Sequence, residues 1–575
     1  MQEWKVVDCS GERRRVRRWE PKEGLRFADL LPEEEKGRKQ VGAEGRFFQG
    51  VPVLAKIGSK LHELAEPVSW EGEEGGEQIV LLDTCDSDGY RVYMRSLMFV
   101  FILAVSRCLP DTHVTVEHSI SGGLYCIIHR EGRDIELDAR TRDEICRHMK
   151  QLIVENRPIT RREVPLAEAR DLFEKMGRRD KLDLLRDYPG REVAIYELDG
   201  VQDSFYGYMV PSTGYLEIFS LELFDRGVVL LGPDRKDRRV VNNFLPTYLL
   251  SQTYNEAEKW SELQGISTAG DLNAVIRAGK IGDICRMTEA LQSYRIMELA
   301  KEIAEKAKRL VLIAAPSSSG KTSFAYKLMT SLRVLGLRPV KLSLDDYFVD
   351  RDKTPLGADG KPDFEALEAL DLPRFQSDLK KLLQGERVSR ISFDFVQGKR
   401  KDHAGEYELG QRDPVIIEGI HGLNPALTRG LPQEQFFKIY LSVLTQINLD
   451  WHNRIPTTDL RLMRRMTRDM QFRGRSPRQT LREWPQVRRG EKRNIFPYQE
   501  EADAMFNSSF LYEIAAMKPY IEPELRKIGP EEEANTEAGR LLSILKYFLP
   551  MESTEDVVNT SILREFIGGS RIVEN

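Results

Sequence analysis

Near the middle of the 575-residue chain, small and hydroxyl-bearing side chains stand directly before a lysine and a threonine. Residues 315–322 read APSSSGKT, which fits the phosphate-binding loop pattern G-x-x-x-x-G-K-[ST] at every position but the first, where Ala315 replaces glycine. A methyl group fits at Ala315 if its φ stays negative. In such a loop backbone N–H groups hold phosphates, Lys321 reaches the β- and γ-phosphates, and the Thr322 hydroxyl ligates Mg²⁺. The predicted nucleotide-binding residues are Pro316, Ser317, Ser318, Ser319, Gly320, Lys321, Thr322 and Ser323.

Acidic side chains end two apolar runs downstream of this loop. Asp345 and Asp346 end the run PVKLSLDD, and Glu418 ends the run PVIIE. Strand ends beside a phosphate loop face the ligand crevice, so these carboxylates can hold a metal ion. Asp345 can also accept the proton of an attacking hydroxyl. The alternative for the aspartate pair is a turn or a helix cap, which such pairs often mark.

A strongly basic segment lies further along the chain. Arginines on a mobile helix can close over a triphosphate and neutralise charge during phosphoryl transfer. The alternatives are a solvated basic face and an RNA contact. Residues 461–478 contain seven arginines: Arg461, Arg464, Arg465, Arg468, Arg473, Arg475 and Arg478.

Regular elements must position these groups. Residues 309–315, RLVLIAA, form a short apolar run typical of a buried parallel strand, and residues 321–336 have a helical pattern that ends at a glycine. The loop therefore joins a strand end to a helix start, where backbone N–H groups and the helix dipole favour phosphate. After residue 308 strands, loops and helices alternate, which predicts a parallel α/β domain over residues 306–575.

The motifs SSSGKT, LSLDDYF, DFEALEALD, FDFVQGKR, IIEGI and RRMTRDMQFRGR follow one another in residues 308–520. This region resembles the uridine kinase and phosphoribulokinase group of P-loop kinases. The resemblance implies ATP and Mg²⁺ as cofactors and Asp345 as the catalytic base. Further residues implied for catalysis are Lys321, Arg468, Arg473 and Arg475, with Arg465 as an additional ATP contact. The implied metal environment is Thr322, Asp345 and Glu418, and the implied acceptor pocket is Asp345, Phe364, Glu365, Phe393 and Phe395.

The departures from that family fall in the acceptor pocket. Uridine kinases usually carry an aspartate at the position of Glu365, a tyrosine at that of Phe393 and a base-reading histidine near Gly398. The loss of a side chain that hydrogen-bonds the substrate can change substrate specificity by orders of magnitude. Kinase chemistry is therefore better supported than uridine as the acceptor.

Three units are expected before this domain. Residues 1–68 mix short strand-like runs with loops and predict a small α+β domain, followed by an acidic, glycine-rich linker over residues 69–78. Residues 79–235 mix strands and helices, including the buried helix SLMFVFILAVS and a helix closed by Gly177. Residues 236–305 are almost wholly helical in pattern and predict a connector.

Residues 79–235 resemble the second additional domain of threonyl-tRNA synthetases, through HMKQLIVENRPITRREVPLAEARDLFEKMGRRDKLDLL and DSFYGYMVPSTG. That domain edits with an H-x-x-x-H pair and a Cys-x-x-x-His pair, whose matching positions here are Met94, Met98, Phe205 and Met209. Apolar side chains cannot supply a thiolate, an imidazole or a metal ligand. We therefore expect the α+β fold without editing activity, preceded in residues 1–68 by the ubiquitin-like domain of synthetases.

Composition limits the remaining classes of partner. Hydrophobic residues are 41% and charged residues 31% of the chain, with a net charge of −5, so no overall basic field recruits nucleic acid. Six scattered cysteines without a C-x-x-C pair, and no secretory signal, predict a cytoplasmic protein with reduced thiols and no membrane partner. Cys126 and His129 lie three apart in a strand-like run, on opposite faces, which favours a structural role.

The expected activity is ATP- and Mg²⁺-dependent phosphoryl transfer to the 5′-hydroxyl of a nucleoside. Two alternatives stay open: an RNA-responsive P-loop NTPase switch, and a kinase of another sugar-bearing metabolite. Self-association and RNA contact by the front half, for instance through ERRRVRR at residues 12–18, are also left open.

Overall fold

The computed structural model describes residues 4–8, 15–19, 24–31, 51–68, 78–357, 360, 362–394 and 397–573. The predicted linker lies outside these residues except for its last position, and so do Cys9, Phe395 and residues 12–14 of the basic run. Residues 15–18 of that run belong to strand β2. The five cysteines that the structure describes are all free thiols.

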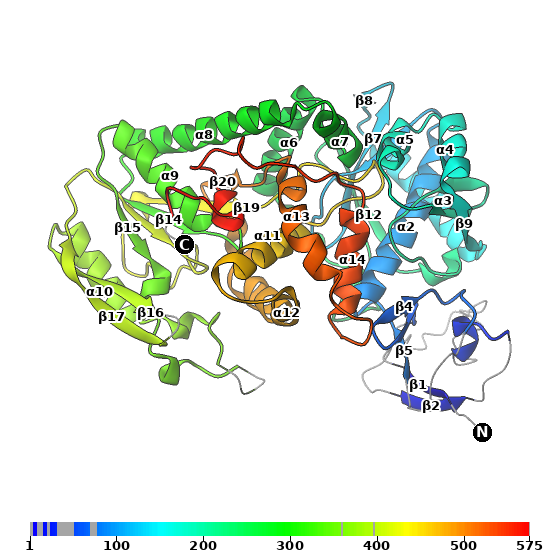
Figure 1. Ribbon diagram of the computed structural model, residues 1–575, viewed down its shortest axis with the longest axis horizontal. Helices are drawn as coiled ribbons and strands as arrows, with labels where there is room; N and C mark the ends of the chain where they lie inside the picture. Colours follow the sequence, from blue (N-terminus) through cyan, green and yellow to red (C-terminus); the bar gives the residue numbers. More distant parts are fainter. Residues whose placement is uncertain are drawn as a thin grey trace.

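A five-stranded parallel sheet forms the centre of the C-terminal half, in the order β15-β18-β14-β19-β20 (Figure 1). Every residue of β14 is buried, because helices cover both faces of the sheet. Val311 and Ile313 pack into the core formed with α8, α9, α11 and α13, while Leu310 and Leu312 face the α10 side. The strands are β14 (Leu310–Ala314), β15 (Val340–Ser343), β18 (Val415–Glu418), β19 (Phe436–Ser442) and β20 (Ala504–Asn507).

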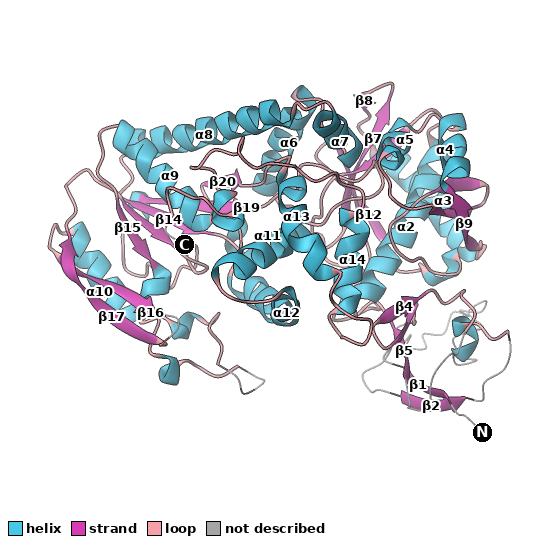
Figure 2. Cartoon of the chain, in the orientation of Figure 1, coloured by secondary structure: helices cyan, strands magenta, loops and turns pink. Residues whose placement is uncertain are grey.

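Helices and one two-stranded ribbon surround this sheet. The predicted strand–loop–helix unit is present, since β14 leads into the loop and then into α9 (Lys321–Val334). The ribbon pairs β16 (Val388–Asp394) with β17 (Lys399–Tyr407) at one edge of the domain (Figure 2). The other helices are α10 (Leu372–Leu383), α11 (Thr457–Phe472), α12 (Pro477–Asn494), α13 (Glu513–Leu525), α14 (Asn535–Leu545) and α15 (Arg564–Ile567).

The first sheet of the front half extends beyond the predicted boundary at residue 68. Its order is β2-β1-β5-β3-β4, and β5 pairs with β1 in parallel and with β3 antiparallel. The strand after the linker therefore completes the small N-terminal sheet. Its members are β1 (Trp4–Asp8), β2 (Arg15–Trp19), β3 (Leu54–Ile57), β4 (Lys60–His62) and β5 (Gln78–Leu82).

Two antiparallel sheets and four helices form the rest of the front half, as an α+β fold requires. One sheet has the order β11-β10-β9 and the other β12-β13-β7-β6, with β8 paired to β7. The strands are β6 (His113–Val116), β7 (Leu124–Arg130), β8 (Arg133–Asp134), β9 (Ile159–Pro165), β10 (Glu192–Leu198), β11 (Val201–Asp203), β12 (Ser220–Phe224) and β13 (Gly227–Leu231). The helices are α2 (Ser87–Cys108), α3 (Ala139–Val154), α4 (Leu166–Lys175) and α5 (Arg179–Arg186).

Helix α2 contains the predicted apolar helix and is the core element of this region. Among the described helices it alone is long and apolar enough to cross a bilayer, and 72% of its most apolar stretch is buried inside the protein. It packs against α3 and against the sheets through Leu97, Phe99 and Phe101. Such burial is typical of a core helix.

Three helices connect the halves, as the sequence predicts: α6 (Tyr248–Leu263), α7 (Ala269–Arg277) and α8 (Ile281–Glu305). The long α8 runs along the core of the C-terminal half, where Ile296, Leu299 and Ile303 pack with α9. The chain thus returns from the front half directly to the start of β14 (Figure 1).

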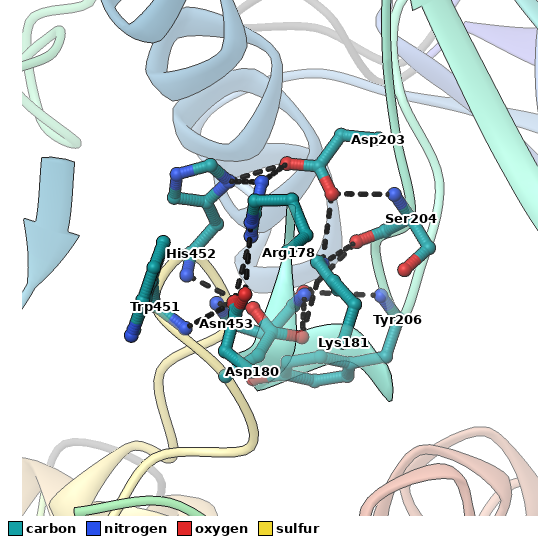
Figure 3. A network of polar contacts seen from close by, with 10 residues as sticks. Arg178, Asp180, Lys181, Asp203, Ser204, Tyr206, Trp451, His452 and Asn453 are labelled. Carbon is teal, nitrogen blue, oxygen red and sulfur yellow. Dashed lines mark hydrogen bonds and ion pairs between the residues drawn. The ribbon is translucent and has the colours of Figure 1, made fainter. Parts of the chain in front are cut away.

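A buried polar network also joins the halves, at the loop that precedes α11 (Figure 3). Lys181 is 0% exposed and forms ion pairs of 2.9 Å with Asp203 and 3.0 Å with Asp450. The His452 ring contacts Asp203, and Arg178 pairs with Asp180 at 2.7 Å. Buried charges are costly unless paired, so this network fixes the position of residues 450–453 against the front half.

Candidate active site

A cavity of about 620 Å³ opens at the carboxyl end of the parallel sheet. Its walls include the loop after β14, the ends of β15 and β18, and the basic segment around α11. Residues within the segment 348–365, Phe393 of β16, the middle of α12 and Glu565 complete the lining. Of the predicted site residues it contains Ser317, Ser318, Ser319, Gly320, Lys321, Thr322, Asp345, Phe364, Glu365, Phe393, Glu418, Arg465, Arg468, Arg473 and Arg475. Pro316 and Ser323 are buried behind the loop rather than lining the cavity.

The loop backbone explains the residue types found in it. Gly320 has a φ of 79°, and a Cβ there would lie 2.3 Å from the Ile562 side chain, so glycine is required on both counts. Ser318 also has a positive φ, of 63°. Ala315 does not have a positive φ. Its side chain is fully buried in the core that also contains Val311 and Phe324. Its methyl group is thus part of the packed core and does not distort the loop.

Two hydroxyls in the loop lack the partners that buried polar atoms normally have. Ser318 and Ser319 are 4% and 0% exposed, and neither Oγ has a hydrogen-bond partner among the described residues. Buried polar groups are almost always hydrogen-bonded, and an exception calls for an explanation such as an absent ligand. The loop also ends at the N-terminus of α9, where the helix dipole attracts anions. This geometry fits a nucleotide phosphate.

Asp345 lies two residues beyond the strand, not on it. β15 ends at Ser343, and the predicted strand end at Asp345 and Asp346 is a single 3-10 turn, Leu344–Tyr347. The turn leaves Asp345 open to the cavity, where the protein environment raises the pKa of its carboxyl. Desolvation is the main cause and the Glu418 carboxylate the next, while Lys321 and Arg473 oppose the rise.

Glu418 ends β18 as predicted and is 3% exposed. It accepts hydrogen bonds from the Ser343 hydroxyl at 3.1 Å and from Lys341 Nζ at 3.4 Å. No group of three or more His, Cys, Asp or Glu side chains that could hold a metal ion occurs in the part of the chain that the structure describes. Mg²⁺ usually takes only one or two carboxylates, completed by substrate phosphates and water. The oxygen donors of Asp345, Glu418 and Thr322, all lining one cavity, fit that mode.

The arginines of α11 divide into an anchored and a cavity-facing group. Arg461 and Arg464 are 1% and 0% exposed and pair with Glu491 and Glu513. Arg461 also donates to the Ser317 carbonyl at 3.0 Å. The first half of α11 is therefore fixed in the core, whereas a mobile helix was expected from the sequence. Arg478 lies away from the cavity and pairs with Glu532 at 3.0 Å.

The cavity-facing arginines surround one buried carboxylate, Asp469. It is 0% exposed and lies 3.0 Å from Arg468, 3.4 Å from Arg465 and 3.8 Å from Arg473. Glu483 also pairs with Arg465, at 3.7 Å, and with Arg475, so two acids face four guanidinium groups on this wall. Burial, and then the neighbouring Arg468, lower the pKa of Arg473 to about 10. The excess of positive charge predicts that this wall binds an anion.

Aromatic side chains also line the cavity. The rings of Phe348 and Phe393 lie 5.6 Å apart, and Phe364 is 41% exposed beside them. Burial raises the pKa of the Glu365 carboxyl, and the nearby Lys321 and Arg465 partly offset the rise. These residues form an apolar surface with one carboxylate, as an acceptor pocket requires. Phe395 lies outside the described residues.

Three acidic residues of this site were missed from the sequence. Glu565, near the C-terminus, lines the cavity and accepts hydrogen bonds from Ser323 Oγ at 2.7 Å and Ser323 N at 3.3 Å. Glu491 accepts from Ser317 N at 3.1 Å. Asp469 had a sequence signal, since it is the one acid among closely spaced arginines, whereas Glu565 and Glu491 lie far from any motif.

The four front-half positions matched to an editing site form an apolar core. Met94, Met98, Phe205 and Met209 are 5%, 2%, 6% and 1% exposed and belong to one hydrophobic cluster. The structure therefore brings the four positions into one hydrophobic cluster, in which their own side chains supply no polar group. Cys126 and His129 lie on β7, where His129 contacts Thr115 at 2.8 Å and Asp134 at 2.9 Å.

Comparison with known proteins gives a different match for each half. Residues 310–514 match the model of the phosphoribulokinase/uridine kinase family. A uridine kinase from Leuconostoc citreum is 26% identical over 166 residues, which are 29% of this chain and 70% of the relative. A D-glycerate 3-kinase structure from Cryptococcus neoformans aligns with 14% identity and a TM-score of 0.28, over 37% of this chain and 93% of that one.

A threonine–tRNA ligase from Carboxydothermus hydrogenoformans is 31% identical over 170 residues, which are 29% of this chain and 26% of the ligase. The chain thus spans about a quarter of the length of the ligases it matches. The motifs, the parallel sheet and the family match agree with one another. Residues 310–514 have the parallel sheet of a P-loop kinase fold and match the phosphoribulokinase/uridine kinase family model, and the region before them is similar to threonine–tRNA ligases.

Proposed function

We propose that this protein transfers the γ-phosphoryl group of ATP to a hydroxyl of a small acceptor, with the 5′-hydroxyl of a nucleoside as the leading candidate. One observation carries the proposal. Lys321, Asp345 and a cluster of arginines, which are far apart in the sequence, line a single cavity beside buried hydroxyls without partners. That combination holds a triphosphate at one end and leaves an acceptor-sized space at the other.

The loop and the basic segment hold the nucleotide. Backbone N–H groups at the start of α9, together with Ser318 and Ser319, receive the phosphates, and Lys321 neutralises the transferred group. Arg468, Arg473 and Arg475 face the same space and stabilise the charge that spreads over the phosphoryl oxygens during transfer. Arg465 fixes the loop by donating to Ser317 Oγ at 2.9 Å.

Thr322, Glu418 and Asp345 would hold Mg²⁺, which would supply charge neutralisation at the phosphates. Asp345 then acts on the acceptor, since its carboxylate is open to the cavity and accepts the hydroxyl proton as the bond to phosphorus forms. Its raised pKa makes it a stronger base than an ordinary aspartate.

The acceptor end favours a ligand with a planar ring and a sugar. Phe348 and Phe393 offer ring faces, and the Glu365 carboxylate can accept hydrogen bonds from sugar hydroxyls. A kinase of another sugar-bearing metabolite is the second candidate. It is supported by Phe393, which stands where uridine kinases usually have a tyrosine.

The test is ADP release from Mg·ATP by the purified protein, measured against ribonucleosides, deoxyribonucleosides, sugars and polyols. Products are identified by mass, and Asp345→Asn is the control. A nucleoside-dependent rate with a 5′-monophosphate product supports the leading candidate, and a rate with sugars alone supports the second. No acceptor-dependent rate with any of them would overturn both.

A further inference from the structure

A second cavity, of about 440 Å³, lies between the two halves of the molecule and is separate from the kinase site. Its walls come from β4, α2, β9, β10, the segment after β11, and α14. Three of its features point to a ligand: unbalanced positive charge, a set of tyrosine rings, and a glycine that keeps its space open. Its volume falls in the range of small-molecule sites.

Positive charge is only partly balanced on these walls. Arg91 pairs with Asp88 and Glu537, at 2.6 and 2.7 Å, and Arg161 contacts Glu163. Glu192, the remaining acid of the wall, is exposed at its edge.

Two cations on these walls have no acidic partner. No carboxylate within ion-pair distance of Arg95 or Lys546 occurs among the described residues. Arg95 is a half-buried guanidinium whose hydrogen bond goes to the Tyr208 carbonyl at 2.8 Å. A partly buried cation without a counter-charge favours an anionic ligand.

The backbone is shaped around Arg95. Gly207 has a φ of 136°, and a Cβ at this position would lie 2.6 Å from the Arg95 guanidinium. Any other residue would therefore displace Arg95 from the cavity wall. The arginine and the glycine together form a fixed place for a negatively charged group.

Tyrosine rings line the same space. The Arg95 guanidinium carbon lies 5.6 Å from the centre of the Tyr206 ring. The rings of Tyr188 and Tyr547 stack with their centres 5.2 Å apart, and Lys546 Nζ lies over both rings. Such rings and cations together bind a planar ring next to a negative charge.

Gly539 keeps the cavity open. It lies within helix α14, where glycine weakens the helix relative to alanine, and a Cβ there would meet no atom within 4 Å. Glycine at this position therefore leaves space in the cavity but makes helix α14 less stable than alanine would.

The cavity is connected to the kinase site by direct ion pairs. Arg540 of its wall pairs with Asp459, in the first turn of α11, with an Nη2–Oδ1 distance of 2.9 Å. The same helix carries Arg461 and Arg465, which hold Ser317 of the phosphate loop.

The wall also reaches the loop before α11. Tyr206 donates from its backbone to Asn453 Oδ1 at 3.2 Å (Figure 3). Its hydroxyl donates to the Arg454 carbonyl at 2.5 Å. An anion in the cavity competes with Asp459 for Arg540, so its binding changes how α11 is held against the phosphate loop.

We propose that this cavity is an effector site for a nucleoside monophosphate, whose phosphate binds Arg95 and Arg540 and whose base packs against the tyrosines, and that occupancy weakens ATP binding at the phosphate loop. The direction follows from the competition for Arg540, which loosens the first turn of α11. Coupling of this kind is reciprocal, so ATP also weakens binding of the monophosphate.

The test measures binding of UMP, AMP, ribose 5-phosphate and inorganic phosphate to the full-length protein by isothermal titration calorimetry. Gly539→Phe fills the cavity, while Gly539→Ala adds one methyl group in open space and is the matched control. We expect the phenylalanine variant, and separately Arg95→Gln, to weaken monophosphate binding about tenfold or more, and the alanine variant to bind as the wild type does. The monophosphates should bind more tightly than ribose 5-phosphate or inorganic phosphate.

Lys321→Met separates this cavity from the kinase site, because it should leave the Gly539-sensitive binding intact. The binding readout needs no turnover, so it stands even if no acceptor is phosphorylated. Equal affinity of the Gly539→Phe and Gly539→Ala variants for the monophosphates would show that they do not bind in this cavity. Equal affinity for ribose 5-phosphate and the monophosphates would overturn the role of the rings. An ATP affinity that the monophosphate leaves unchanged would overturn the coupling.

Discussion

The front-half core around Met98 and the kinase cavity around Lys321 both bring together residues that are distant in sequence. They differ in whether the buried side chains include polar atoms without hydrogen-bond partners among the described residues. In the front half the four gathered side chains are apolar and packed against one another. In the kinase cavity two buried hydroxyls have no partner and three arginines share one buried acid. A packed apolar cluster is complete without a ligand, whereas unpaired buried polar groups cost free energy until a ligand binds.

The largest expected effect is at Asp345. Asp345→Asn removes the base while keeping the size of the side chain, so turnover should fall about 10²- to 10⁴-fold with ATP affinity nearly unchanged. Steady-state rates and ATP titration of the variant provide the measurement. Full turnover in the variant would show that Asp345 is not the base. The contrast between a reactive cavity and a packed apolar core would then be weaker.

Arg473 should have the next largest effect. Arg473→Ala removes a cavity-facing guanidinium and should lower kcat about 10²-fold, because charge on the transferred group is then less stabilised. Arg478→Ala is the matched control, since Arg478 is on the same basic segment but pairs with Glu532 outside the cavity. Equal losses in the two variants would mean that the segment acts through its total charge rather than through the cavity.

A pair of substitutions tests the contrast directly through stability. Met98→His puts a polar ring into the packed front-half core and should cost about 1–3 kcal/mol of unfolding free energy. Ser319→Ala removes a buried hydroxyl that has no partner and should change stability by less than about 0.5 kcal/mol, while weakening ATP binding. Urea unfolding of both variants provides the measurement. A large loss from Ser319→Ala would mean that the hydroxyl is already satisfied within the protein.

The smallest effect is expected at Glu565. Its carboxylate binds Ser323 at the N-terminus of α9, where phosphates of the nucleotide are expected. Glu565→Gln removes the like charge and should raise ATP affinity about three- to tenfold, since an anion near a helix N-terminus contributes about 1 kcal/mol. Calorimetric titration with an ATP analogue measures the change. A lower affinity would show that Glu565 supports the loop instead of competing with the phosphates.

Local pattern predicted much of the kinase half. The run RLVLIAA became the buried strand β14, and the following loop and helix α9 lie where the sequence placed them. Short motifs succeeded here because a phosphate loop depends on adjacent residues and on a backbone that glycine and small residues allow. The aspartate pair was displaced into a 3-10 turn, since tertiary contacts decide where a strand ends.

Contacts between distant segments could not be predicted. Glu565 reaches Ser323 across 242 residues, and Asp450 reaches Lys181 across 269. Neither residue belongs to a periodic or motif-like pattern, so only the folded chain reveals its partner. The same holds for β5, whose pairing with β1 moved the end of the first sheet past the predicted boundary.

The amino-acid sequence by itself determined the type of chemistry, because the phosphate loop, the acids after the strands and the arginines are fixed by residue type and local spacing. The tertiary structure alone decided which of those arginines face the cavity and which are anchored in the core. It also decided that Arg95, Gly539 and Arg540 enclose a second cavity next to α11. The physical reason is that burial and charge pairing depend on neighbours in space, which lie up to hundreds of residues away along the chain.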